Sequence, residues 1–237
     1  MNFKASYDIK LAPTLGNHWY EISRGGKFVS CVPSATTILQ SYPTSPQLLK
    51  WLAENGWSES QRIKNEAGSK GTRVHTAIET LLNGNTLDQI NFSLEEWYKI
   101  YCFTRWYADY KPEIISLEMP IFSKKYGYAG RTDCICKIDG RIHLVDWKTS
   151  RSIHKNFFLQ FAAYAHAIEE MTDLKIAETA GIQLGAANKN GYRMVLSKCW
   201  PDDFERFLDV KRIWEYDNGI DEDHEAPVLN LPNQIKL

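Results

Sequence analysis

Apolar residues recur every three or four positions in several long stretches of the chain, which is the spacing of one face of an α-helix. In residues 66–83 they include Val74, Ile78 and Leu81, and Gly84 follows as a stop signal. Similar patterns predict helices over residues 95–110 and 156–171 and helices that open at Ser34 and at Pro201. The aromatic side chains of residues 95–110 suit a buried face, with base stacking as the alternative.

Shorter segments rich in β-branched and aromatic residues predict strands between these helices. One strand lies around residues 114–122, and a turn near residues 124–127 leads from it into a hairpin of residues 132–138 and 141–147. These segments would form three consecutive antiparallel strands. Residues 179–187 and 192–198 predict a further pair, whereas the first hundred residues suggest an entry strand or loop followed by mostly helical segments.

The hairpin has a turn that fixes its register. Asp139-Gly140 is a preferred pair for a two-residue turn with positive φ at both positions, so Ile138 should face Arg141. Continuing the pairing places Asp133 opposite Asp146, and it places two basic residues opposite each other as well, namely Arg131 and Lys148. A slip of one residue would put the two acids on opposite faces.

Lys148 lies two residues after Asp146 and therefore points to the same side of the strand as both aspartates. Directly opposed residues have Cβ atoms roughly 4.5–5.5 Å apart, a gap that a divalent cation with oxygen ligands at about 2.0–2.1 Å can bridge. Carboxylate ligands favour Mg²⁺ or Mn²⁺ over zinc. An exposed hairpin with scattered charges is the alternative.

The length of 237 residues suits one α/β domain. We expect a mostly helical part in residues 1–112, a catalytic core in 113–200, and a C-terminal helix with an acidic tail in 201–237. The tail carboxylates of residues 217–225 lack calcium-loop spacing. The first eleven residues resemble neither a secretion signal nor a transit peptide, and no apolar run approaches the ~20 residues of a membrane span. These features favour a cytoplasmic protein of a bacterium, or of a phage in its host.

Five cysteines at irregular spacing indicate reduced thiols, with Cys134 and Cys136 packed in the core on the hairpin face opposite the acids. The net charge of −1 does not indicate a nucleic-acid-binding protein, so a phosphate-binding surface would have to be local. Basic residues do cluster near the hairpin, although a solvated basic edge would give the same pattern: Lys124, Lys125, Arg131, Lys148, Arg151, His154 and Lys155.

Several motifs occur in a specific order along about half of the chain: Gly71/His75, Glu118, Gly130/Asp133, Asp146-Trp147-Lys148-Thr149-Ser150 and Gln160/Tyr164, preceded by Pro33-Ser34-Ala35-Thr36-Thr37-Ile38-Leu39. This order resembles the RecB-like exonuclease branch of the PD-(D/E)xK nuclease superfamily. Within that branch, the chain is most similar to phage-type exonucleases and to the mitochondrial genome maintenance exonuclease.

The resemblance implies a restriction-endonuclease-like core, a mixed central β-sheet flanked by helices. It implies that Asp133 and Asp146 bind the metal ion together with the Trp147 backbone carbonyl, and that Lys148 is the catalytic lysine. His75 would be an additional ligand and Glu118 a supporting acid. A structural helix histidine is the alternative for His75.

The resemblance also implies that Gln160 and Tyr164 contact DNA, whereas a buried tyrosine hydrogen-bonded to a glutamine is the alternative. Further candidates for holding the DNA backbone are short polar or basic side chains near the two motifs: Arg131, Thr149, Ser150, Arg151, Ser34, Thr36 and Thr37. Helix capping explains Ser34, Thr36 and Thr37 equally well.

Some relatives in this branch carry an iron-sulfur cluster held by one early and three late cysteines. Cys199 alone follows the Gln160/Tyr164 helix, so we expect no such cluster. The chain also has no GxxxxGK[ST] phosphate loop of a helicase motor. The leading hypothesis is a metal-dependent exonuclease that acts on single-stranded DNA or DNA ends in replication, repair or recombination, with proteins of those processes as further partners. The alternatives are a structure-specific endonuclease and an inactive DNA-end-binding module.

Overall fold

A five-stranded mixed sheet forms the centre of the protein, in a computed structural model that describes residues 1–4, 6–14 and 18–219. The strand order is β10-β9-β8-β7-β4, and β8 and β9 are parallel whereas the other neighbours are antiparallel. The bounds are β4 Glu113–Leu117, β7 Cys134–Ile138, β8 Arg141–Lys148, β9 Glu178–Leu184 and β10 Tyr192–Leu196. The predicted class, a mixed central sheet flanked by helices, is confirmed.

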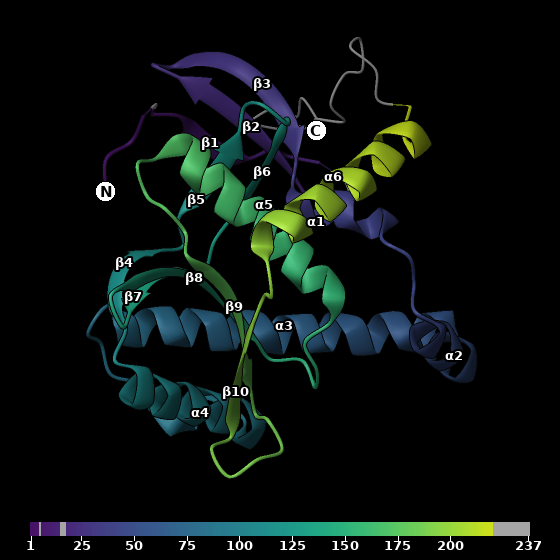
Figure 1. Cartoon of the computed structure of the whole chain (residues 1–237). Coiled ribbons are helices and arrows are strands. Elements are labelled where there is room, and N and C mark those ends of the chain that lie inside the picture. Colours follow the sequence, from purple (N-terminus) through teal and green to yellow (C-terminus); the bar gives the residue numbers. More distant parts are fainter. Residues whose placement is uncertain (5, 15–17, 220–237) are drawn as a thin grey trace, which may run out of the picture.

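Helix α5 (Lys155–Met171) connects the parallel strands β8 and β9, because parallel neighbours need a crossover connection. It packs against α6 (Trp200–Asp217) on one side of the sheet, where Phe161 and Phe207 join Ile135 and Leu144 in one core cluster. Figure 1 shows α5 and α6 in the upper part of the molecule. Both helices begin within one residue of the predicted positions.

Helices α3 (Trp57–Leu82) and α4 (Leu94–Tyr110) cover the other side of the sheet. Their buried residues Ile78 and Trp106 pack with Cys134 and Cys136 in a second core cluster, and both cysteines are free thiols. The prediction that the hairpin cysteines are core residues is therefore confirmed. Two of the α4 aromatic residues, Phe103 and Trp106, are buried and contact the Trp147 ring edge to face, whereas Tyr98, Tyr101 and Tyr107 are exposed. The prediction of a buried aromatic face therefore holds for only part of this helix.

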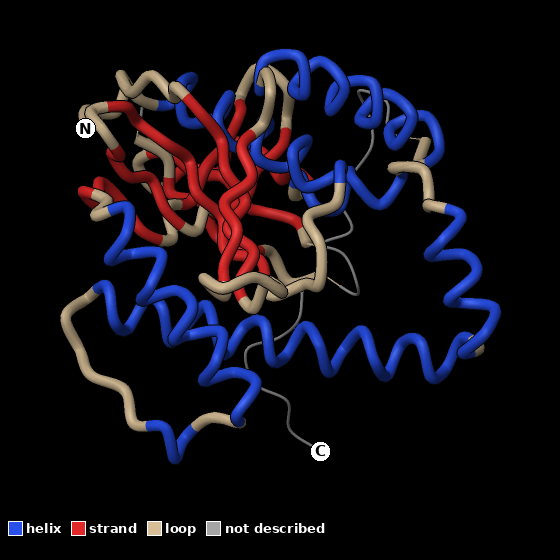
Figure 2. Tube along the Cα trace, turned by 60° about the horizontal axis from the view of Figure 1, so that its bottom comes forward, coloured by secondary structure: helices blue, strands red, loops and turns tan. Residues whose placement is uncertain are grey.

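The N-terminal region contains three strands where a single strand or loop was expected. Strands β1 (Asp8–Leu11), β2 (Trp19–Arg24) and β3 (Lys27–Pro33) form a separate antiparallel sheet. Short helices follow before α3: α1 (Ala35–Ile38), the 3₁₀ turn η1 (Leu39–Ser41) and α2 (Pro46–Asn55). A further 3₁₀ turn, η2 (Gln89–Asn91), precedes α4. In Figure 2 the strands gather at the centre, and the helices surround them.

The predicted strand over residues 114–122 is two strands. β4 ends at Leu117, and β5 (Pro120–Ser123) leaves the main sheet to pair with β6 (Tyr128–Arg131). The break lies at Glu118, whose φ of 47° is incompatible with a continuous strand. The three consecutive antiparallel strands are therefore β4, β7 and β8, with the β5–β6 hairpin inserted between the first two.

The predicted turn and its register are confirmed. Asp139 and Gly140 have φ of 47° and 78°, and Ile138 pairs with Arg141. The regular ladder extends to Cys134 and Val145 and ends there, one position before the two aspartates. Arg131 does not lie opposite Lys148, because Arg131 belongs to β6 and pairs with Pro120.

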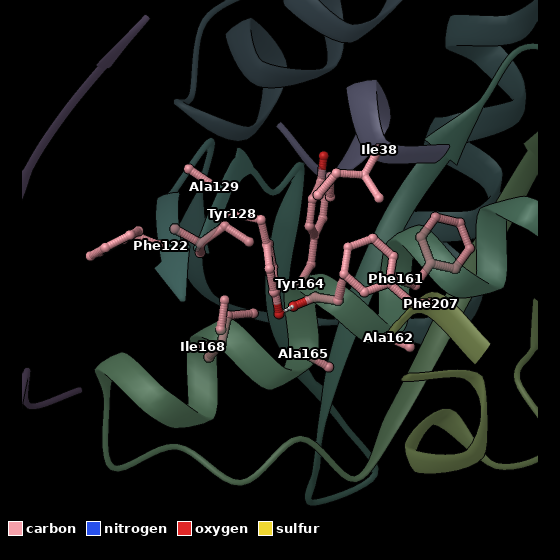
Figure 3. Close-up of a cluster of buried hydrophobic side chains, with 14 of the residues drawn as sticks. Ile38, Phe122, Tyr128, Ala129, Phe161, Ala162, Tyr164, Ala165, Ile168 and Phe207 are labelled. Atoms are coloured by element: carbon pink, nitrogen blue, oxygen red, sulfur yellow. Dashed lines mark hydrogen bonds between the residues drawn. The ribbon is translucent and has the colours of Figure 1, made fainter. Parts of the chain in front are cut away.

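Buried aromatic residues tie the β5–β6 hairpin to α5 (Figure 3). The Tyr128 hydroxyl donates a hydrogen bond of 2.8 Å to the Ala163 carbonyl, and its ring meets Phe207 edge to face. This contact fixes β6, and with it Gly130, against the helix that carries Gln160 and Tyr164.

No helix in the described ranges is long and apolar enough to cross a membrane. The acidic tail beyond residue 219 lies outside the described residues.

Candidate active site

Asp133 and Asp146 come together at the point where the regular β7–β8 ladder ends. The chain leaves β6 at Thr132, and the carbonyl of Asp133 accepts a 3.0 Å hydrogen bond from the N–H of Glu118. The Asp133 side chain meets β8, where its Oδ2 accepts a 2.8 Å hydrogen bond from the N–H of Trp147. Both acids therefore lie at the same end of the sheet, as the hairpin register predicted.

Two basic side chains neutralise the aspartates. His75 of α3 places Nδ1 3.3 Å from Oδ2 of Asp133, and Lys148 forms a close ion pair with Asp146. These pairs compensate for burial, since the side chains of Asp133 and Asp146 are 14% and 7% exposed. The structure thus joins α3 and the hairpin, two segments far apart in the sequence, in one centre.

Lys148 also contacts the face of α5. Its Nζ donates a 3.3 Å hydrogen bond to Oε1 of Gln160, and Nε2 of Gln160 donates a 3.0 Å bond to the Tyr164 hydroxyl. The ammonium lies 4.3 Å from the centre of the Phe157 ring, a cation–π contact. The sequence motif residues Lys148, Gln160 and Tyr164 therefore form one chain of contacts. Tyr164 is buried and hydrogen-bonded to Gln160, as the structural alternative for this pair also predicted.

The buried charges separate the pKa values of the two aspartates. Burial and the nearby Asp133 carboxylate raise the pKa of Asp146 to about 7. Burial also opposes ionisation of Asp133, but the favourable charges of His75 and Lys148 outweigh it and lower the pKa of Asp133. Burial would lower the pKa of His75, yet the Asp133 carboxylate raises it to about 9. His75 is therefore a cation at neutral pH in this arrangement.

The donor set suits a hard divalent cation, because two buried carboxylates adjoin each other at one end of the sheet. Within residues 1–4, 6–14 and 18–219, no three His, Cys, Asp or Glu side chains are already arranged as a metal-binding group. The positive charges of His75 and Lys148 balance the aspartates instead. A cation between Asp133 and Asp146 would replace part of this charge and release the proton of His75.

An open pocket of about 470 Å³ lies beside Asp133, between α3 and the strand break at Glu118. Glu118 and Arg131 line the pocket wall across from α3, with Oε2 of Glu118 3.9 Å from Nη1 of Arg131. Burial and the Asp133 carboxylate raise the pKa of Glu118. The pocket therefore brings four predicted site residues to the same opening, namely His75, Glu118, Arg131 and Asp133.

One face of α3 supplies residues of this pocket that sequence reasoning did not assign to the site. Gly68, Thr72 and Glu79 line it together with His75. They lie seven residues before, three before and four after His75, which is the spacing of one helical face. That spacing was visible in the sequence and could have identified them.

Tyr20 of β2 is a further residue near the pocket that the sequence did not assign to the site. It is partly buried, and the charges of Arg131 and Glu118 act on its hydroxyl. The signal for it was weak, because the β1–β3 sheet was itself not predicted. Its position shows that the N-terminal sheet approaches the wall of the pocket.

Two glycines of the sequence motifs, Gly71 and Gly130, permit close packing in the site. A Cβ on Gly71 would lie 3.2 Å from Oγ1 of Thr149, and a Cβ on Gly130 would lie 2.6 Å from the Tyr164 ring. Gly71 therefore lets α3 approach the segment after β8. Gly130 lets β6 approach α5.

The remaining candidates for holding DNA differ in their surroundings. Ser34 and Thr37 are buried, and Ser34 caps α1 by accepting a 2.9 Å hydrogen bond from the Thr37 N–H, whereas Thr36 is exposed. Helix capping thus explains Ser34 and Thr37. The Ser150 hydroxyl donates to the carbonyl of Ser152, and Arg151 is exposed after β8. Thr36 and Arg151 therefore remain accessible to a ligand.

Comparison with known proteins finds a human relative of this chain. No family model matches the chain. The chain is similar to human mitochondrial genome maintenance exonuclease 1, with 27% identity over 177 residues, which cover 68% of this chain and 50% of that protein. The chain thus spans about half the length of this relative. The similarity supports a relationship to this exonuclease.

A solved structure of a protein from Eubacterium rectale, provisionally named an exonuclease, also overlaps with the chain. The overlap has a TM-score of 0.42 and 16% sequence identity, and it covers 70% of this chain and 72% of that one.

Proposed function

We propose that the protein is a metal-dependent DNA exonuclease that hydrolyses phosphodiester bonds of single-stranded DNA or of DNA ends. The observation that carries the proposal is the convergence of Asp133, Asp146 and Lys148 at one end of the sheet. The similarity to a human exonuclease supports the reaction class. Replication, repair or recombination are the processes in which such an activity would serve.

Asp133 and Asp146 would hold Mg²⁺ or Mn²⁺, with the Trp147 carbonyl and neutral His75 as further ligands. The bound cation would polarise the phosphate and lower the pKa of a coordinated water. Lys148 has a different role. Its ammonium, held by Gln160 at 3.3 Å, would orient the attacking water or stabilise the charge that develops on the phosphate oxygens.

Gln160 and Tyr164 would position the strand next to the phosphate being cleaved. Their hydrogen bond of 3.0 Å fixes both side chains on the face of α5 that meets Lys148. Arg131 and Arg151 are exposed and would contact the backbone phosphates. Because the net charge of the chain is −1, such contacts must be local rather than a property of the whole surface.

Degradation of end-labelled single-stranded DNA with Mg²⁺ or Mn²⁺ tests the proposal. The native protein should degrade the linear strand, and Lys148→Ala should lower the rate by about 100-fold or more. A circular single strand of the same sequence should stay intact. Cleavage of the circle would favour the endonuclease alternative, and absence of cleavage with either metal would favour a DNA-end-binding module.

A further inference from the structure

Gly68 is a glycine that the packing of the protein does not require. It lies on the exposed surface of the 26-residue helix α3 and lines the pocket beside Asp133. An ideal Cβ at Gly68 has no heavy atom within 4 Å among the described residues. By contrast, a Cβ on Gly71 would approach Thr149. The neighbours of Gly71 explain its lack of a side chain, whereas those of Gly68 do not.

Glycine in a helix interior is less stable than alanine, because it loses more backbone freedom on folding. The backbone of Gly68 is ordinary helix and has no positive φ that would favour glycine. The helix therefore carries a destabilising residue at a position where alanine would fit. The space that this residue leaves open belongs to the pocket.

Gly68 shares a helix face with Thr72 and His75, and at a rise of about 1.5 Å per residue it lies about 10 Å from His75 along the axis. This face thus leads from the outside of the pocket to Asp133. The α3 wall at Gly68, Gly71 and Thr72 is uncharged, and Arg131 lies on the wall formed by the strand break. The α3 wall is suited to a sugar or a base. On the other wall Arg131, 3.9 Å from the carboxylate of Glu118, offers the positive charge for a phosphate.

We propose that Gly68 is a clearance position, at which an unpaired nucleic-acid strand crosses α3 on its way to the aspartates. This inference rests on the proposed nuclease function. The strand places the sugar and base of a nucleotide against Gly68, Gly71 and Thr72, with a phosphate toward Arg131. A pocket of about 470 Å³ is in the lower part of the range for small-ligand sites and fits a single nucleotide rather than a duplex.

Substitutions at Gly68 that add bulk test the proposal. Gly68→Leu should lower kcat/KM for a labelled single-stranded oligonucleotide by about tenfold or more, since it fills the path of the strand. Gly68→Ala should cause a smaller loss. The same alanine should raise the melting temperature by about 2 °C, because it removes a glycine from the helix interior. Increased stability with decreased activity would support a position kept open for a ligand.

Ala67→Leu is the matched control, because Ala67 is exposed on the same helix and does not line the pocket. It should keep kcat/KM within about twofold of the native value. Equal activity of Gly68→Leu and the native protein would overturn the proposal. An equally large loss in Ala67→Leu would overturn it as well, because the effect would then not depend on the pocket.

Binding without cleavage separates this inference from the proposed function. Fluorescence anisotropy with a labelled oligonucleotide in EDTA should show that Gly68→Leu weakens binding by about tenfold and that Ala67→Leu does not. If the native protein cleaves no DNA with either metal, the nuclease proposal fails, while the binding comparison still decides the role of Gly68. Unchanged binding by Gly68→Leu would overturn the clearance role even in an active nuclease.

Discussion

Gly130 and Tyr164 lie so close that a Cβ on Gly130 would be 2.6 Å from the Tyr164 ring. Gly130→Ala should therefore lower the free energy of unfolding by about 1–3 kcal/mol and displace the tyrosine, because the buried ring has little room to move. Urea denaturation measures the loss. In a Tyr164→Leu background the same substitution should cost less, and an equal cost would show that the two residues are not coupled.

Gln160 links Lys148 to Tyr164, so its loss should affect activity more than stability. We expect Gln160→Ala to lower kcat by about tenfold or more, because Lys148 loses its acceptor on α5 and is held by Asp146 alone of the two. Gln160→Glu keeps an acceptor oxygen and should retain more activity. Single-turnover rates on labelled DNA compare the two variants. Their melting temperatures check that both fold. Equal rates for the two variants would argue against a positioning role through Lys148.

Metal affinity should increase with pH. Burial and the Asp133 carboxylate raise the pKa of Asp146 to about 7, and the same carboxylate outweighs burial to raise the pKa of His75 to about 9. Both groups are mainly protonated at pH 6.5, and a cation must displace these protons. Calorimetric titration with Mn²⁺ should show affinity rising between pH 6.5 and 8.5, by up to about tenfold per pH unit for each proton displaced.

Asp146→Asn provides the control for this pH dependence, because the amide carries no titrating proton. Its Mn²⁺ affinity should be lower at every pH and should rise less steeply. Native affinity that is constant from pH 6.5 to 8.5 would contradict the assignment of Asp146 and His75 as ligands.

Arg131 and Arg151 should contribute to DNA binding through phosphate contacts. Each change to alanine should weaken binding and reduce the salt dependence by about one unit of the log–log slope. Anisotropy titrations over a range of salt concentrations measure both quantities. Lys137→Ala is a suitable control, since Lys137 lies on β7 near Glu113, outside the pocket residues. Unchanged slopes for both arginine variants would remove them from the DNA-binding surface.

The sequence predicted the register of the β7–β8 hairpin correctly, because a short-range rule determines it. Asp139-Gly140 fixes a turn, the turn fixes the register, and the register brings Asp133 and Asp146 to one end of the sheet. Helices with strong apolar periodicity, such as α5, were also predicted within a residue or two. In both cases the information is local in the chain.

Other features depend on contacts between distant segments and were not predictable in the same way. Strand β5 leaves the main sheet after Glu118, a non-glycine residue with positive φ, and pairs with β6. Because Arg131 lies on β6 and pairs with Pro120 of β5, it does not lie opposite Lys148. The start of α3 lies nine residues before the predicted start at residue 66, because its first half lacks a clear apolar face.

The candidate centre draws its side chains from α3, the link between β6 and β7, β8 and α5, which together extend from position 75 to position 164. Asp133 and its basic partner His75 come from segments that are far apart in the sequence, whereas Asp146 and Lys148 share β8. Contacts between such distant positions form late in folding, because they require the closure of long loops. Recovery of activity after dilution from denaturant should therefore lag behind recovery of helical signal, so catalysis reports on completed assembly of the domain.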